Sequence, residues 1–284
     1  MTELSQPDYL NTDWMQSDHP PLYDWYDEFY DDLEMWNMLC SKFEGPVLDL
    51  ACGTGRVAIS LARAGLNVVG VDISQHMVAC ALDKLNRDGS EIRDRVDFIV
   101  GDMTKLDLDS VFPIAIIPCN SLNELCTFEA QAACIRSVWQ HLAPGGALVI
   151  VAVPWNGCGS TSEPEEAEDL WERKPFYEAV NPHTGLLTRQ WILGGWGDSS
   201  LQQHFHRFYF EELDEAGVSV RRFALPPAPK WHVRRFIGRY ELQLLLEKHG
   251  FAVENIYGDY HLGSYGPHSK IMVIEARKEA KHHE

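Results

Sequence analysis

The sequence predicts an α/β fold: a mostly parallel sheet with helices on both faces, and a small antiparallel sheet inserted before the last helix. Apolar runs of strand length alternate with runs of helical periodicity between residues 46 and 153. Such alternation is typical of a parallel sheet covered on both sides. From about residue 155 the alternation stops, and strand-like runs joined by Gly, Asp and Pro turns follow.

Each core element is expected from its own apolar pattern. The expected core strands are 46–51, 67–71, 95–100, 113–119 and 146–153, and the expected helices between them are 55–64, 74–87 and 127–142. The inserted strands are expected around 187–196, 202–210 and 218–225. A last helix over 239–250, closed by Gly250, precedes strands at 251–257 and 270–276.

The predicted domain organisation follows from these elements. Residues 1–44 form an N-terminal helical cap, residues 45–154 and 237–279 form the core, and residues 155–236 form an inserted subdomain for substrate or oligomer contacts. In an open parallel sheet, ligands bind beyond the carboxyl ends of the strands. We therefore expect the site on that edge of the core.

Composition narrows the function classes. The 284 residues are 45% hydrophobic and 23% charged, as in a globular domain. A net charge of −18 argues against nucleic acid, because phosphate binding depends on Lys and Arg. No apolar run is long enough to cross a membrane and the N-terminus shows no secretory signal, so we expect a cytoplasmic protein. Seven cysteines without a C-x-x-C pair are expected to be reduced thiols.

The first strand leads into a glycine turn. Gly53 and Gly55 separate the strand from a helix that begins near Arg56, which is the arrangement of a nucleotide-type ligand site. The second strand ends in Asp72, where a carboxylate can accept hydrogen bonds from ribose hydroxyls. Residues 53–58 also fit the dinucleotide pattern G-x-G-x-x-G/A, so a NAD(P)-dependent oxidoreductase remains open.

Four motifs together separate these cofactors. Asp49 precedes the glycine turn, Asp72 ends the second strand, Gly101-Asp102 follows the third, and Pro144-Gly-Gly146 precedes the fifth. In this order they resemble the class I S-adenosylmethionine-dependent methyltransferases, with Ala51 in place of the first glycine of the motif. The resemblance implies a Rossmann-like seven-stranded sheet. It also implies S-adenosylmethionine as cofactor and S-adenosylhomocysteine as product.

The resemblance implies a set of cofactor-binding residues around this edge of the sheet. They are Tyr26, Tyr30, Asp49, Ala51, Gly53, Gly55, Arg56, Asp72, Ile73, Asp102, Met103 and Asn120.

The implied roles follow the two ends of the cofactor. Asp49 and the backbone of the glycine turn would hold the methionine end, Asp72 the ribose, and Ile73 with Asp102 and Met103 the adenine. Asp102 could instead cap a turn, and Asn120 could contact the methionine end or simply be a turn residue.

The N-terminal segment carries Tyr26-Asp-x-x-Tyr30, a pattern that recurs at the front of many small-molecule methyltransferases. There the aromatic rings would cover the cofactor and attract its positive charge. Packing of the segment on the core is the alternative.

Residues at the reacting atoms are harder to predict. His204 and His206 share one face of an expected strand, where either could act as a general base, or both could be packed side chains. With Tyr26 they are our catalytic candidates. No three or four metal ligands converge in the sequence, so we expect no metal site.

The expected function is methyl transfer to a small-molecule acceptor. An amine nitrogen is preferred, because a neutral amine needs no strong base and the acidic segments attract a cation. A hydroxyl oxygen is the alternative. The basic residues from Arg221 to Arg239 leave open an acceptor with a phosphate or carboxylate. The inserted sheet is similar in layout to N,N-dimethyltransferases of nucleotide-linked amino sugars, which use it for substrate cover and oligomer contacts, so a homodimer is possible.

Overall fold

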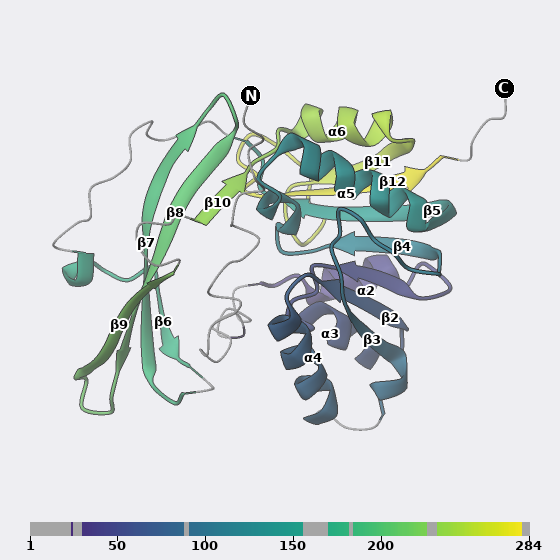
Figure 1. The fold of residues 1–284 in the computed structure, drawn as a ribbon. Coiled ribbons are helices and arrows are strands. Elements are labelled where there is room, and N and C mark those ends of the chain that lie inside the picture. The colour runs from purple at the N-terminus through teal and green to yellow at the C-terminus, as the bar shows by residue number, and fades with distance from the viewer. Residues whose placement is uncertain are drawn as a thin grey trace, which may run out of the picture. The chain divides into compact units, whose positions relative to one another are not determined.

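The computed structural model describes residues 24, 30–87, 91–155, 170–181, 184–225 and 232–279. The chain divides into two compact units (Figure 1). One contains residues 27–156 and 235–284 and is called the core unit here; the other contains residues 1–26 and 157–234 and is called the inserted unit. No helix in the described part of the chain is long and apolar enough to cross a membrane.

The core unit is built on a seven-stranded sheet in the order β11-β12-β5-β4-β1-β2-β3 (Figure 1). Its strands are β1 Val47–Leu50, β2 Val68–Asp72, β3 Val96–Val100, β4 Phe112–Ile117, β5 Leu142–Ala152, β11 Phe251–Tyr257 and β12 Met272–Lys278. The five strands from β5 to β3 are parallel, whereas β12 is antiparallel to both β5 and β11. The expected α/β fold class is confirmed.

Helices cover both faces of this sheet. They are α2 Leu33–Cys40, α3 Arg56–Arg63, α4 Gln75–Arg87, α5 Phe128–His141 and α6 Arg239–Lys248, with 3₁₀ turns at Arg93–Arg95 and Ser121–Glu124. Apolar residues of α5 and α6 form one buried cluster with the sheet, and those of α2, α3 and α4 form another. The Thr127 hydroxyl accepts a hydrogen bond from the Ala130 N–H and so caps α5.

The fifth strand begins earlier than its apolar run predicts. It starts at Leu142 and includes the Pro144-Gly-Gly146 segment as an irregularity opposite Phe112. Gly145 has φ +73°, and a Cβ on Gly146 would lie 2.9 Å from the carbonyl oxygen of Ala143. The two glycines therefore allow a bulge where any side chain would be strained.

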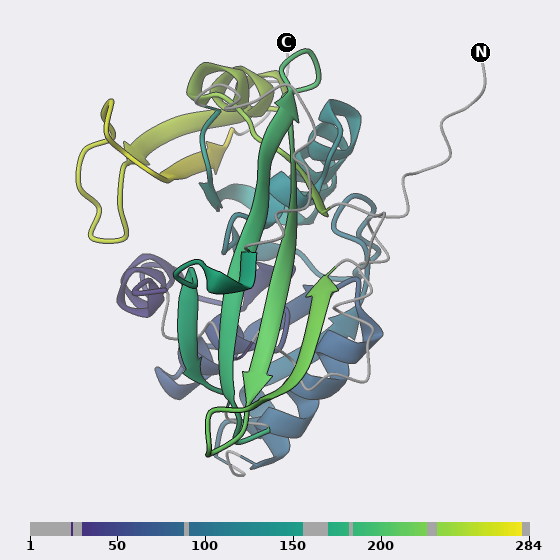
Figure 2. The same cartoon turned by 90° about the vertical axis from the view of Figure 1, so that its left-hand side faces the viewer.

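The inserted unit is a five-stranded antiparallel sheet, seen face-on in Figure 2. Its strands are β6 Tyr177–Val180, β7 Leu187–Asp198, β8 Gln203–Leu213, β9 Ser219–Leu225 and β10 His232–Arg235, and Leu170–Glu172 forms a 3₁₀ turn. The long strands β7 and β8 pair along their length, and β10 and β9 both pair with β8.

Aromatic side chains pack on both faces of the inserted sheet. Trp191 is buried with Tyr209 and is met edge-on by Trp171, with the ring centroids 5.2 Å apart. Phe210 stacks on Phe223 in a second cluster. Trp171 and Trp191 are therefore part of the packed core of the inserted sheet.

Two strands of this sheet, β6 and β10, are absent from the sequence-based expectation. Each has four residues, too few to show a clear alternation, and each contains charged residues. They become strands because β7 and β8 offer unpaired edges to them.

Candidate functional site

The candidate site lies in the core unit, at the edge where the parallel strands end. The glycine turn follows β1, Asp72 ends β2, Gly101-Asp102 follows β3, and Cys119-Asn120 follows β4. Since β4, β1, β2 and β3 are neighbours in this order, one edge of the sheet brings together every described cofactor candidate on these loops.

The glycine turn is a run of left-handed backbone. Ala51 has φ +54°, Gly53 +56° and Gly55 +84°. Ala51 is the exception, because a residue with a Cβ is strained there. A Cβ on Gly55 would lie 2.7 Å from the Phe98 ring, so packing of α3 against β3 requires glycine at this position regardless of any ligand.

Asp49 is fully buried in β1 beneath the turn, and neither of its carboxylate oxygens has a hydrogen-bond partner among the described residues. The pKa of Asp49 is raised to about 8, chiefly by burial and also by nearby Asp72 and Asp32, while Arg56 and the neighbouring backbone N–H of Ala58, which does not meet hydrogen-bond geometry, act in the opposite direction. A buried carboxylate without a partner is costly. The ammonium of a methionine moiety is the complementary group, so the residues present fit the methionine end of S-adenosylmethionine.

Asp72 joins the turn to the end of β2. Its two oxygens accept hydrogen bonds from the backbone N–H groups of Gly53 and Ser74, both at 2.8 Å. Burial raises the pKa of Asp72, and these two hydrogen bonds oppose the rise. The next side chain, Ile73, is apolar and 41% exposed. An acid beside an exposed apolar surface suits a ribose with its adenine.

Asp102 caps a turn. Its Oδ1 accepts hydrogen bonds from the Thr104 N–H at 2.9 Å and the Thr104 hydroxyl at 2.7 Å, and its Oδ2 lies 3.8 Å from the Lys105 ammonium. This is the alternative that the sequence left open, and it leaves Oδ2 as the oxygen for a ligand. Met103 is partly buried against the core cluster of α5 and α6.

The loop after β4 is strained. Cys119 and Asn120 have φ of +53° and +60°, a left-handed conformation that is strained for Cys119 and better tolerated by Asn120. The Oδ1 of Asn120 is buried and has no hydrogen-bond partner in the described part of the chain. Strain and an unpaired buried oxygen on one loop are features of functional sites.

Arg56, expected to bind the cofactor, is held by an acid that the sequence did not single out. Its guanidinium lies 2.6 and 2.9 Å from the two carboxylate oxygens of Asp32, and 3.1 Å from the Cys119 sulfur. The indole N–H of Trp36 donates to the same carboxylate at 2.9 Å. The Tyr30 ring lies under the guanidinium, 5.1 Å from its carbon. Tyr30 thus packs on the Arg56–Asp32 pair.

None of the three predicted catalytic residues belongs to the described part of the core unit. Tyr26 lies outside the described residues. His204 and His206 belong to the inserted unit, where His206 stacks on His232 at 4.6 Å between ring centroids and meets Phe208 edge-on. His206 is therefore packed among rings, and a catalytic role for these three residues stays a prediction.

The basic residues between Arg221 and Arg239 do not form one free anion site. Arg222 lies 2.7 Å from Glu211, and Arg235 is buried, donating to Gln131 at 2.6 Å and Glu241 at 2.5 Å. These two arginines are already paired within the protein, so they do not support binding of an acceptor phosphate or carboxylate.

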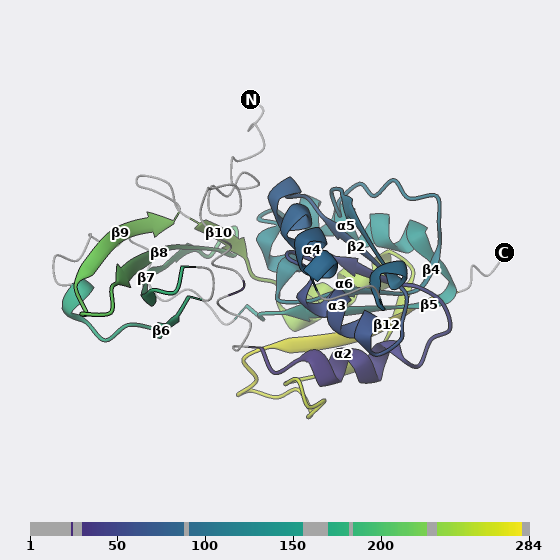
Figure 3. The same ribbon diagram turned by 90° about the horizontal axis from the view of Figure 1, so that it is seen from below.

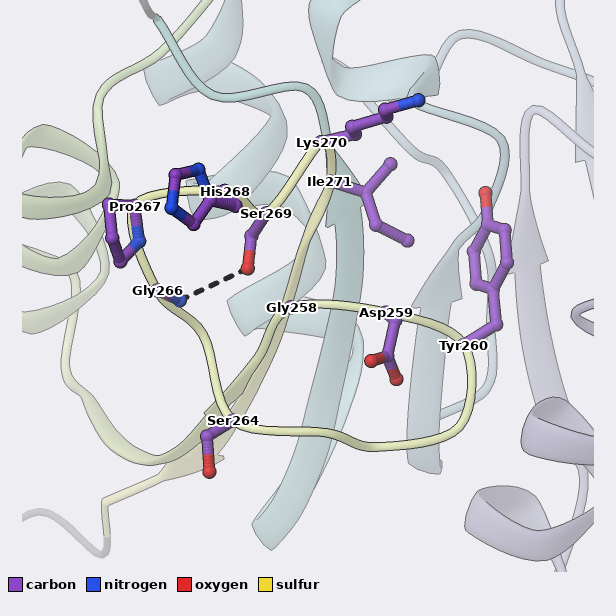
Figure 4. Close-up of a pocket in the computed structure, with 10 residues that line it drawn as sticks. All are labelled: Gly258, Asp259, Tyr260, Ser264, Gly266, Pro267, His268, Ser269, Lys270 and Ile271. Carbon is purple, nitrogen blue, oxygen red and sulfur yellow. Dashed lines mark hydrogen bonds between the residues drawn. The ribbon is translucent and has the colours of Figure 1, made fainter.

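A pocket of about 600 Å³ lies along the β11–β12 loop on the same edge of the core unit (Figure 4). It is lined by Gly258, Asp259, Tyr260, Ser264, Gly266, Pro267, His268, Ser269, Lys270 and Ile271. None of these was predicted, because the loop carries no recognisable motif. Tyr260 is the notable one, since its phenol also lies close to the Arg56–Asp32 pair.

The fold and the glycine turn place the chain in the class of Rossmann-like α/β proteins. Residues 47–146 match a family model described as "Methyltransferase domain". A Geobacillus sp. (strain WCH70) protein named as a methyltransferase is 30% identical over 190 residues, covering 61% of this chain and 74% of that protein. The chain belongs to this methyltransferase family, whose cofactor is S-adenosylmethionine.

Other similarities agree with this. A Bacillus subtilis (strain 168) protein named as a methyltransferase is 34% identical over 130 residues, which cover 44% of this chain. The match spans 51% of that relative, so this chain covers about half of the relative's length. The CcbJ methyltransferase from Streptomyces caelestis superposes with a TM-score of 0.68 at 22% identity, covering 88% of this chain and 91% of its own. The sugar N-methyltransferase KedS8 from Streptoalloteichus sp ATCC 53650 has a TM-score of 0.62 at 19% identity, covering 91% and 93%. At these identities the two structures show a shared fold.

Proposed function

We propose that this protein transfers the methyl group of S-adenosylmethionine to an amine nitrogen of a small molecule. The observation that carries the choice of nitrogen is the loop after β4, where the family holds the transferred methyl. This loop presents a thiol, an amide and a hydroxyl, from Cys119, Asn120 and Ser121. These three side chains include no strong base for neutral pH, so the choice favours a neutral amine, which is nucleophilic without losing a proton, over a hydroxyl, which has to be deprotonated.

The bound cofactor supplies a methyl group on a sulfonium leaving group, so an amine forms its C–N bond with its own electron pair as the methyl–sulfur bond breaks. The proton on the resulting ammonium then leaves to water. Asp49 would hold the methionine ammonium, Asp72 the ribose and Ile73 the adenine face. Catalysis then rests on holding the amine in line with the methyl carbon.

Charge and a structural neighbour support an amine. The net charge of −18 attracts the cationic form of an amine over long range, and the first 44 residues contain eleven acids and one base. An amine that arrives as a cation loses its proton to water before its nitrogen reacts. KedS8, with the same fold, is named as a sugar N-methyltransferase. An amino sugar is therefore the first acceptor class to test.

The test is a matched panel of acceptors with isotope-labelled methyl donor. Each amino sugar would be paired with the sugar that has a hydroxyl at the same carbon, and S-adenosylhomocysteine formation and the methylated product would both be measured. We expect turnover with an amine and at least about tenfold less with its hydroxyl partner, a difference of about 1.4 kcal/mol in the barrier. Equal or greater turnover of hydroxyl partners would favour an oxygen acceptor. Asp72→Ala serves as the variant that loses cofactor binding.

A further inference from the structure

The β11–β12 loop is built to present one side chain, Tyr260. The carboxylate of Asp259 accepts hydrogen bonds from the backbone N–H groups of His261 and Gly263, both at 2.9 Å, and the Gly258 N–H donates to the Gly263 carbonyl at 2.8 Å. A Cβ on Gly263 would lie 2.4 Å from the Asp259 carboxylate, so a larger residue there would displace the carboxylate that closes the turn. The turn is therefore rigid around Tyr260.

Sheet topology brings this loop to the cofactor edge. Met272, at the start of β12, is opposite Ala152, at the end of β5, and Tyr257, at the end of β11, is opposite Val273. The loop between β11 and β12 therefore leaves the sheet at the same edge as the loops after β1 and β4. Figure 3 shows it beside α2, in agreement with the packing of Tyr260 against the core cluster that contains the α2 side chains.

The phenol of Tyr260 points into a polar cluster made by other segments. In Figure 4 its hydroxyl points away from Asp259 and Ser264. Burial raises the pKa of Tyr260, and the nearby Asp32, Cys119 and Tyr30 raise it further, while Arg56 lowers it. The phenol therefore keeps its proton at physiological pH, and its oxygen is a neutral hydrogen-bond acceptor as well as a donor.

This cluster marks the methyl end of the cofactor site. Cys119 follows β4 and Arg56 begins α3, whereas Asp72 and Ile73, the expected ribose and adenine neighbours, follow β2 on the far side of β1. Moving along the edge from β3 toward β5, a ligand would pass from the adenine end to the methionine end. Tyr260 lies on the β4 side, where the acceptor has to approach.

We propose that Tyr260 is an acceptor-binding residue whose phenol oxygen takes a hydrogen bond from the N–H of the incoming amine and so turns the nitrogen lone pair toward the methyl group. This inference rests on the proposed function. A neutral phenol suits the role because it orients the amine without protonating it.

The test needs no knowledge of the natural acceptor. Sinefungin has an amine where the transferred methyl is carried, whereas S-adenosylhomocysteine has nothing there, so the ratio of their dissociation constants reports contacts at the methyl position. Calorimetry would compare the unaltered protein, Tyr260→Phe, and Tyr257→Phe as a matched control. Tyr257, at the end of β11, is likewise half-buried against the same cluster, but its hydroxyl interacts with Glu275 instead.

We expect Tyr260→Phe to reduce the preference for sinefungin by about ten- to hundredfold, the range for one lost hydrogen bond to a charged amine, with S-adenosylhomocysteine affinity and thermal unfolding unchanged. Tyr257→Phe should change neither the sinefungin preference nor the S-adenosylhomocysteine affinity. An unchanged ratio in Tyr260→Phe would overturn the inference, whether both affinities stay the same or both fall equally. An equal fall in both affinities would mean that Tyr260 contacts the methionine carboxylate instead. If the unaltered protein binds neither compound, the proposed function itself fails, and this inference with it.

Discussion

Because Asp49 is buried, we predict that without cofactor the protein becomes less stable as pH rises. Its pKa of about 8 in the folded protein compares with about 3.9 for an unperturbed aspartate. Between these two values the folded protein holds a proton that the unfolded chain has released. Unfolding therefore releases a proton, and the free energy of unfolding falls with increasing pH by about 1.4 kcal/mol per unit. Across roughly four units, the loss reaches about 5 kcal/mol near pH 8.

Asp49→Asn removes this titration while keeping the size of the side chain. We expect the stability advantage of the variant to be near zero at about pH 4 and to grow to about 5 kcal/mol at pH 8, because the amide is never charged. The same variant should bind S-adenosylhomocysteine more weakly by about 1.5–3 kcal/mol, since the methionine ammonium loses its carboxylate. The reasoning therefore predicts that Asp49→Asn is more stable than the unaltered protein but binds S-adenosylhomocysteine more weakly.

The measurement is urea unfolding at half-unit steps from pH 5.5 to 8.5, without cofactor, for the unaltered protein, Asp49→Asn and Asp97→Asn. Asp97 is an exposed acid on β3, and its replacement should leave the pH slope unchanged. Calorimetry supplies the affinities. A stability difference between Asp49→Asn and the unaltered protein that stays constant over this range would refute the reasoning, because it would mean that Asp49 is already ionised in the folded protein.

Three further substitutions test the rest of the site. Ala51→Gly should raise the free energy of unfolding by about 1 kcal/mol, because φ +54° strains alanine but not glycine; lower stability would contradict the strain. Gly55→Ala should lower it by about 2–4 kcal/mol through contact with Phe98, whereas Gly65→Ala, also at positive φ but with open space around it, should cost only about 1–2 kcal/mol. Asp72→Ala should weaken S-adenosylhomocysteine binding by about 1.5–3 kcal/mol in calorimetry, and unchanged affinity would remove Asp72 from the ribose site.

The parts of the fold that could be predicted are those whose pattern is local. The strand before Gly53 and the helix after Gly55 follow from apolar spacing, and Asp72 follows from the end of an apolar strand. The strands β6 and β10 could not be predicted, because four residues with mixed polarity become a strand only when a long neighbour pairs with them.

The candidate site divides in the same way. Asp49, Asp72 and the glycine turn belong to motifs, so their positions could be read along the chain. Asp32 and Tyr260 belong to no motif, and they meet Arg56 only because the sheet brings the α2 entry and the β11–β12 loop to one edge. Asp102 belongs to a motif, but its carboxylate also caps a local turn by accepting the Thr104 N–H, so the motif alone did not settle its role.

One buried side chain has a consequence for how this enzyme can vary. Asn123 accepts a hydrogen bond from the Val153 N–H at 2.9 Å and donates to the Arg235 carbonyl at 3.0 Å, so it holds the point where the chain departs from the core and the point where it comes back. The intervening eighty or so residues can therefore be exchanged as a cassette between relatives without moving the ends to which they attach. Asp49 and Asp72, the expected methyl-donor residues, lie outside this stretch and would be unaffected by such an exchange.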